Sequence, residues 1–152
     1  MNKFMQEAIK EAKKAQAEGE VPVGAVVVFN GEIIARAHNL SEKNKNPMHH
    51  AEILAIEKAL KSIDSKNLKG AELYVTLEPC AMCMSACRLC KVDKVYFGAY
   101  DTKSGACGGK IDLSRENCFD YKTEVYGGIE EEECSKILKE FFESVRKEQR
   151  YE

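Results

Sequence analysis

The chain contains four closely spaced cysteines, at positions 80, 83, 87 and 90, within the stretch LEPCAMCMSACRLC (77–90). Clustered thiolates at such spacings typically hold a metal ion such as zinc. A site closed by four thiolates is structural, whereas a site with three protein ligands and one open position is catalytic. The first alternative predicts a protein with a structural metal site and the second predicts an enzyme. Residues outside this stretch distinguish between them.

A second group of possible ligands lies in MHHAEIL (48–54), where His49 and His50 precede Glu52 at the start of a predicted helix. Cys80 and Cys83 also lie in the first turn of a predicted helix, where the partial positive charge of the helix terminus favours thiolate. One imidazole and two thiolates leave one position open, and zinc held in this way activates water for hydrolysis. Glu52 is then the expected proton carrier beside the metal.

The elements that must position these residues follow from the hydrophobic pattern. Apolar residues recur at helical spacing in some segments, while β-rich runs and the Asn30-Gly31 turn mark strands and a hairpin in others. We expect helices over 2–18, 50–63, 80–90 and 130–149, and strands over 24–29, 32–36, 72–77, 94–100 and, briefly, 122–128. The segment 101–121 is polar and has no clear period, so we expect it to be a loop that covers a site.

The order of these elements predicts an α/β protein. Strands separated by single helices pair in parallel through crossover connections, while the hairpin must be antiparallel. We therefore expect a mixed sheet with helices on both faces. Sites in such folds gather at the carboxyl ends of the strands, where helices begin. The histidine–glutamate pair and the two cysteines are expected to converge at this edge.

Length and composition favour a single domain over residues 1–152, because 44% hydrophobic content suffices for one core. No apolar run is long enough to cross a bilayer, and the N-terminus lacks the apolar centre of a signal peptide. Seven cysteines without such a signal favour a reducing compartment, so we expect a cytoplasmic protein without membrane association. The net charge of −2 argues against electrostatic nucleic-acid binding by the molecule as a whole.

The motif HAE at 50–52, followed by PCAMC at 79–83, matches H-x-E…P-C-x-x-C, the established signature of zinc-dependent nucleobase deaminases. The similarity extends over nearly the whole chain and includes EVPVGAVVV, NPMHHAEILAI, LYVTLEPCAMC, VYFGAYDTKSGACGG and VYGGIEEEECSKILKEFF. In these segments the chain resembles bacterial tRNA adenosine deaminases (TadA type), within the zinc-dependent cytidine/deoxycytidylate deaminase superfamily. VPVGAV together with LEPCAMC and the GAxDxKxGA loop is much more specific than H-x-E alone.

The resemblance implies a set of site residues. It implies one zinc ion per subunit, held by His50, Cys80 and Cys83, because the family's histidine ligand directly precedes Ala-Glu. It makes Glu52 the catalytic proton carrier and Asn39 the side chain that hydrogen-bonds the substrate nucleoside. The remaining cysteines of the cluster, at positions 87 and 90, are then expected in the core or at a subunit interface.

The fold and activity that the resemblance implies are equally specific. The fold is a three-layer α/β/α cytidine-deaminase-like architecture with a mixed, roughly five-stranded sheet. The activity is zinc-dependent hydrolytic deamination of adenosine to inosine at the wobble position of tRNA, in the anticodon loop, by a homodimer.

Two alternatives remain open from the sequence. The first is a deaminase of a free nucleobase or nucleoside, of the guanine or cytosine type. The second is a non-catalytic zinc or iron–sulfur RNA-binding module that uses all four clustered cysteines. Such a module has no use for Glu52.

Overall fold

The computed structural model describes residues 1–150 and the side chains of residues 1–149, so the predicted domain limit at 152 lies just outside the described residues. Its helices are α1 (Lys3–Ala17), α2 (Ala51–Ser62), α3 (Ala81–Leu89) and α4 (Glu131–Arg150). Its strands are β1 (Gly24–Phe29), β2 (Glu32–His38), β3 (Ala71–Leu77), β4 (Lys94–Ala99) and β5 (Glu124–Tyr126). Each element lies where the sequence predicts it, within two residues at either end.

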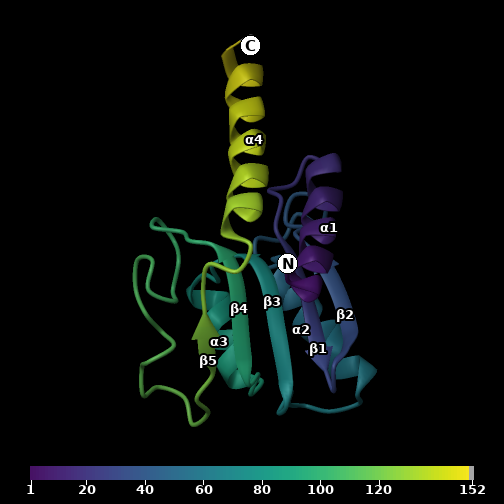
Figure 1. Cartoon of the computed structure of the whole chain (residues 1–152), viewed down its shortest axis with the longest axis vertical. Helices are drawn as coiled ribbons and strands as arrows, with labels where there is room; N and C mark the ends of the chain where they lie inside the picture. The colour runs from purple at the N-terminus through teal and green to yellow at the C-terminus, as the bar shows by residue number, and fades with distance from the viewer. Residues whose placement is uncertain (151–152) are drawn as a thin grey trace.

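The five strands form one mixed sheet in the order β2-β1-β3-β4-β5 (Figure 1). Strand β1 pairs antiparallel with both β2 and β3, whereas β3, β4 and β5 are parallel. Strands β2 and β3 therefore run in the same direction, as expected for strands joined through a single helix, but β1 lies between them. The predicted mixed sheet of about five strands is confirmed.

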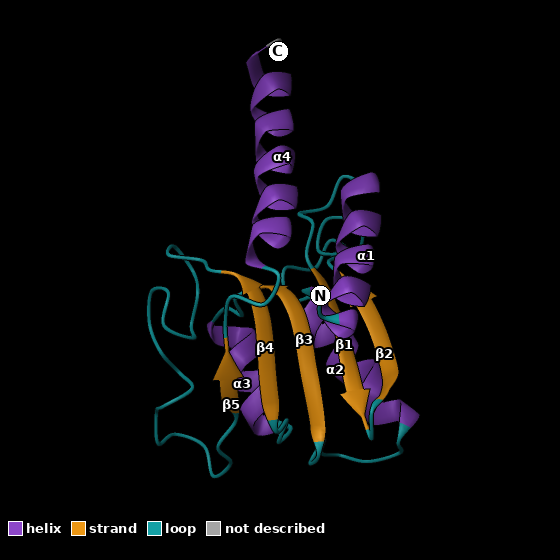
Figure 2. Ribbon diagram, viewed as in Figure 1, coloured by secondary structure: helices purple, strands orange, loops and turns teal. Residues whose placement is uncertain are grey.

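Helices cover both faces of the sheet and complete three layers. Figure 2 shows α1 in front of the sheet and α2 with α3 behind it. Strand β1 is buried on both faces because its side chains alternate: Ala25 and Val27 join the core beneath α2 and α3, whereas Val26 and Val28 join the core beneath α1. Gly24 begins this strand, and a Cβ there would overlap the backbone of α1, so glycine permits the close packing of α1 on the sheet.

The topology brings two helix starts to one edge of the sheet. Strands β2, β3 and β4 share a direction, so their carboxyl ends lie together at the edge that is uppermost in Figure 1. Helix α2 begins after the loop 39–50, which follows β2, and α3 begins directly after β3. His50 and Cys80 are the N-cap residues of these two helices, and both have extended backbone conformations. The edge is therefore the place where the predicted ligands gather.

Two further segments leave the same edge. Residues 100–123 connect β4 to β5 through turns alone, without a helix in this fully described stretch. The first turns of α4 bury Cys134 and Ile137 against the face that α1 covers, and its later turns rise beyond the sheet (Figure 1). Phe142, on these later turns, is 46% exposed. None of the helices in the described part of the chain is long and apolar enough to span a membrane.

Candidate active site

The side chains of His50, Cys80 and Cys83 converge at the edge where α2 and α3 begin. Their ligand atoms all lie within 4.8 Å of one another. His50 Nδ1 lies 3.7 Å from Cys80 Sγ and 3.5 Å from Cys83 Sγ. In the described part of the chain, this is the one cluster of histidine, cysteine and acidic side chains that could hold a metal ion. The sequence predicted the same three residues.

The spacing of these atoms fits tetrahedral zinc. Zinc bonds of about 2.3 Å to sulfur and about 2.0 Å to nitrogen separate the two ligand atoms by about 3.5 Å in a tetrahedral site. The donor chemistry fits as well, because hydrogen bonds from the Cys83 thiol and from His50 help to lower the pKa of Cys80 to about 4. The hydrogen bond to Cys80 and burial raise the pKa of Cys83. The low pKa of Cys80 favours its thiolate form, which is the form that binds zinc.

Glu52 lies in the first turn of α2, beside the three clustered residues. Its side chain is buried, and burial raises the pKa of the carboxyl group to about 7. Both Glu52 and His50 line a cavity of about 260 Å³ that also reaches Asn39. A carboxyl group with a pKa near neutrality is suited to both accepting and donating a proton.

Asn39 lies on the wall of this cavity, where the sequence predicted a substrate-binding side chain. It is 6% exposed, and its backbone N–H donates to the Val23 carbonyl. Its side-chain amide donates to the Val21 carbonyl at 3.3 Å and accepts from the Ser41 N–H at 3.1 Å. An asparagine amide has two donors and two acceptor lone pairs, so one of each remains for a ligand.

The other candidate ligands lie outside the cluster. His49 is held by the side-chain amides of Asn44, at 2.9 Å, and Asn46, at 3.1 Å, one at each ring nitrogen. Cys87 is fully buried in the core beneath α2 and α3, and Cys90 packs against that core. Of the four clustered cysteines, only the first two face His50.

Among the buried charged residues that the sequence analysis did not identify, two hold the loops beside the site. Glu78 is 2% exposed and accepts hydrogen bonds from a loop beside the cavity. The signal for it was a carboxylate placed directly between a buried strand and Pro79-Cys80. Arg88 is 4% exposed and donates to the carbonyls of Leu113, Glu116 and Tyr121.

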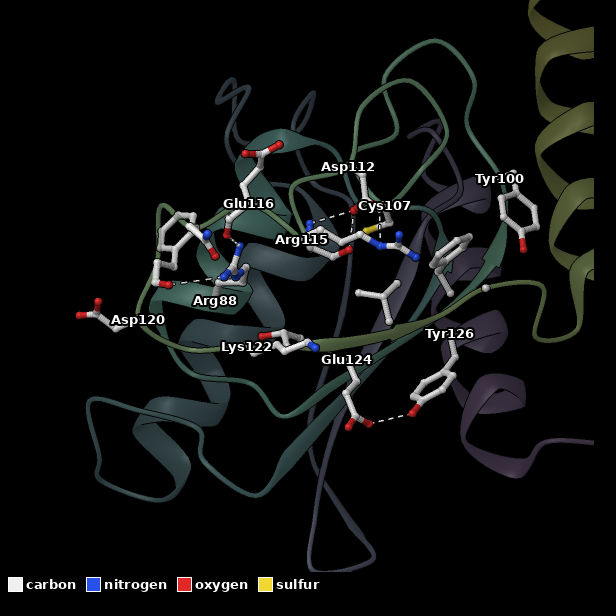
Figure 3. A pocket seen from close by; sticks show the side chains of 17 residues that line it. Arg88, Tyr100, Cys107, Asp112, Arg115, Glu116, Asp120, Lys122, Glu124 and Tyr126 are labelled. Atoms are coloured by element: carbon white, nitrogen blue, oxygen red, sulfur yellow. Dashed lines mark hydrogen bonds and ion pairs between the residues drawn. The ribbon is translucent and has the colours of Figure 1, made fainter.

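Arg88 fixes the long connection between β4 and β5. Figure 3 shows its guanidinium among the backbone carbonyls of this loop, at the wall of a cavity of about 740 Å³. The same loop is held at Tyr121, whose hydroxyl donates to Asp93. No pattern in the sequence predicts the contacts of Arg88, because their acceptors are backbone carbonyls.

Comparison with known proteins places this site in a family. The sequence profile of the cytidine and deoxycytidylate deaminase zinc-binding region matches residues 1–99, which include all three clustered residues and Glu52. The chain belongs to this deaminase family. The zinc-binding character of the family and the cluster of one histidine and two cysteines together support one zinc ion per subunit.

Relatives within the family share nearly the whole chain. The tRNA-specific adenosine deaminase of Bacillus subtilis is 52% identical over 97% of this chain and 91% of its own length. The enzyme of the same name from Aquifex aeolicus is 46% identical over 94% of each chain. A solved structure from a study of A-to-I editing by tRNA:A34 deaminases is 38% identical, with a TM-score of 0.86, over 89% of this chain and 98% of that one. The predicted cytidine-deaminase-like fold is confirmed.

Proposed function

We propose that this protein is a zinc-dependent hydrolase that deaminates adenosine to inosine at the wobble position of tRNA. The observation that carries the proposal is the cluster of His50, Cys80 and Cys83 beside a cavity that Glu52 also lines. The relatives with the names and identities given above support tRNA as the substrate. We further propose the cytoplasm as its location, which the seven free thiols support.

His50, Cys80 and Cys83 are the proposed zinc ligands. Zinc in this position acidifies water at the open site and so supplies the nucleophile. The His50 ring is held at the start of α2 and the two thiols at the start of α3, so the rigid ends of two helices fix the three ligand atoms.

Glu52 is the proposed proton carrier. Attack on C6 of adenine places electrons on the ring, which accepts them only if N1 gains a proton. The Glu52 carboxylate takes a proton from the attacking water and delivers it to N1. It then takes the proton of the hydroxyl now bonded to C6 and passes it to the amine, so that the C6–N bond breaks and ammonia leaves. A pKa of about 7 lets one carboxyl group perform both the basic and the acidic steps near neutral pH.

Asn39 is the proposed contact to the nucleoside. Its side-chain amide uses one donor and one acceptor on the backbone of Val21 and Ser41, and the other donor and acceptor are available to the substrate. The cavity is lined by Glu52, which is buried, so the target nucleotide must leave its stack to reach this side chain. Bases in a single-stranded loop unstack at low cost, which favours an anticodon loop over a duplex.

Incubation of the purified protein with total tRNA, followed by detection of inosine, tests the proposal. We expect inosine at the wobble position of tRNA that carries adenosine there. Glu52→Gln removes the base but keeps the size of the side chain, so it should retain zinc and RNA affinity. Its rate of deamination should be about three orders of magnitude lower than that of the parent protein. Turnover of free guanine or cytidine, with none of tRNA, would contradict the proposed substrate.

A further inference from the structure

The Glu78 carboxylate lies at the carboxyl end of β3 and is directed into one loop. Its Oε1 accepts a hydrogen bond from the Asp101 N–H at 2.9 Å. Its Oε2 accepts from the N–H groups of Cys107, at 3.0 Å, and Gly109, at 2.8 Å. These three donors span the loop 101–109, so a single side chain holds both ends of that loop.

The loop 101–109 forms part of the wall of the catalytic cavity. Asp101 and Ser104 line that cavity together with His50 and Glu52. The loop is also attached beside a proposed zinc ligand, because the Ala106 N–H donates to the Pro79 carbonyl and Gly105 forms a bridge with Cys80. Any movement of the loop would therefore alter the wall of the cavity.

The loop sequence is fitted to the carboxylate. A Cβ at Gly105 or Gly109 would overlap both the Glu78 carboxylate and the Asp101 carbonyl. Two glycines thus allow the backbone to close around the buried charge. Burial of a carboxylate is unfavourable unless hydrogen bonds replace its water, and three charge-assisted bonds from backbone N–H groups do so here.

We propose that Glu78 is a positioning residue that holds the loop 101–109 against the catalytic cavity and thereby sets the affinity for substrate. This inference rests on the proposed function, because it assigns the loop to the wall that meets the target nucleoside. Glu78 itself borders the catalytic cavity, but both of its carboxylate oxygens accept hydrogen bonds from backbone N–H groups of the loop. It acts through the backbone of the loop.

The test is Glu78→Gln, which keeps the shape of the side chain but replaces one acceptor oxygen with a donor. At least one backbone N–H then faces another donor, and each lost bond to a charged group shifts the opening equilibrium of the loop by about 10- to 100-fold. We expect hydrogen exchange in 101–109 to accelerate by about tenfold or more. The KM for an anticodon stem-loop RNA should rise about tenfold, with zinc content unchanged and a smaller change in kcat.

Glu72→Gln is the matched control. Glu72 also lies on β3, but its side chain accepts from the Tyr96 hydroxyl and does not line the cavity. This variant should leave the exchange of 101–109 and the KM unchanged. If Glu78→Gln fails to fold, Gly109→Ala perturbs the same contact from the loop side and should loosen the same segment.

The results separate the two proposals. If the parent protein forms no inosine, the proposed function fails, while the exchange measurement still decides whether Glu78 holds the loop. Unchanged exchange in 101–109 would overturn the positioning role. A loosened loop with unchanged KM would overturn the link to substrate affinity, and loss of zinc in a folded Glu78→Gln protein would show that Glu78 acts on the metal site instead.

Discussion

Individual side chains at the two helix starts divide sharply between those that face the cluster and those that do not. His50, Cys80 and Cys83 face one another, whereas the ring of His49 is held by two asparagines. This difference of one residue along the chain separates a proposed metal ligand from a loop-ordering side chain.

Metal analysis of single variants tests that division. His50→Ala, Cys80→Ala and Cys83→Ala should each lose the zinc ion, because two remaining ligands do not retain it against a chelator. His49→Ala and Cys87→Ala should keep one zinc per chain. Zinc retained by Cys80→Ala would mean that the ligand set is wrong, and a coloured, iron-containing protein would indicate a cluster of a different kind.

Glu52 also makes stability depend on pH in the zinc-free protein. Its folded-state pKa of about 7 lies above the ordinary carboxyl value of 4.5, so the stability that it contributes at low pH is lost as the pH rises through 7. Glu52→Gln removes this loss of stability, because glutamine does not ionise. At pH 8 the variant should gain up to about 3 kcal/mol in free energy of unfolding relative to the parent, with little gain at pH 4.

Denaturant unfolding in the presence of a chelator measures this gain. Glu57→Gln is the control, because Glu57 lies on the exposed face of the same helix. An equal gain for Glu52→Gln at both pH values would show that the buried charge is not its source.

At the scale of the elements, the long connection between β4 and β5 depends on one buried guanidinium. Arg88 donates to the carbonyls of Leu113 at 2.7 Å and Glu116 at 2.6 Å, within a stretch that has no helix or strand of its own. Arg88→Met should lower the free energy of unfolding by about 2–4 kcal/mol, because it leaves these carbonyls without their donor. Zinc should be retained.

Arg115→Met is the matched control for this loop. The Arg115 side chain is 87% exposed and lies 3.5 Å from Asp112, so its loss should change the stability by less than about 0.5 kcal/mol. Equal effects of the two substitutions would contradict the anchoring role of Arg88.

The helices and strands were predictable because their hydrophobic periods are clear. The continuous apolar run GAVVVF marked a buried strand, and Asn30-Gly31 marked the hairpin turn. The position of β1 between β2 and β3 was not predictable from single segments, because pairing of distant strands depends on the whole sheet. The roles of Glu78 and Arg88 were not predicted for a related reason, because their partners are backbone groups of a loop without a sequence pattern.

At the scale of the whole molecule, the proposed homodimer remains a prediction. The family resemblance implies it, and the chain has a mass of 17.1 kDa. We expect light scattering after size exclusion to give twice this mass at micromolar concentration. A monomer mass at every concentration, in protein that deaminates tRNA, would show that one chain suffices for the activity.

The ligand cluster also has a consequence for the unfolded chain. His50 and Cys80 lie 30 residues apart, so an ion that joins them acts as a cross-link that closes a loop of that length. By the polymer argument used for disulfides, closing such a loop reduces the entropy of the unfolded ensemble by the equivalent of about 3.6 kcal/mol at 25 °C. Removal of the ion should therefore lower the free energy of unfolding by at least that amount. The proposed zinc site would thus also stabilise the fold, because it joins the start of α2 to the start of α3.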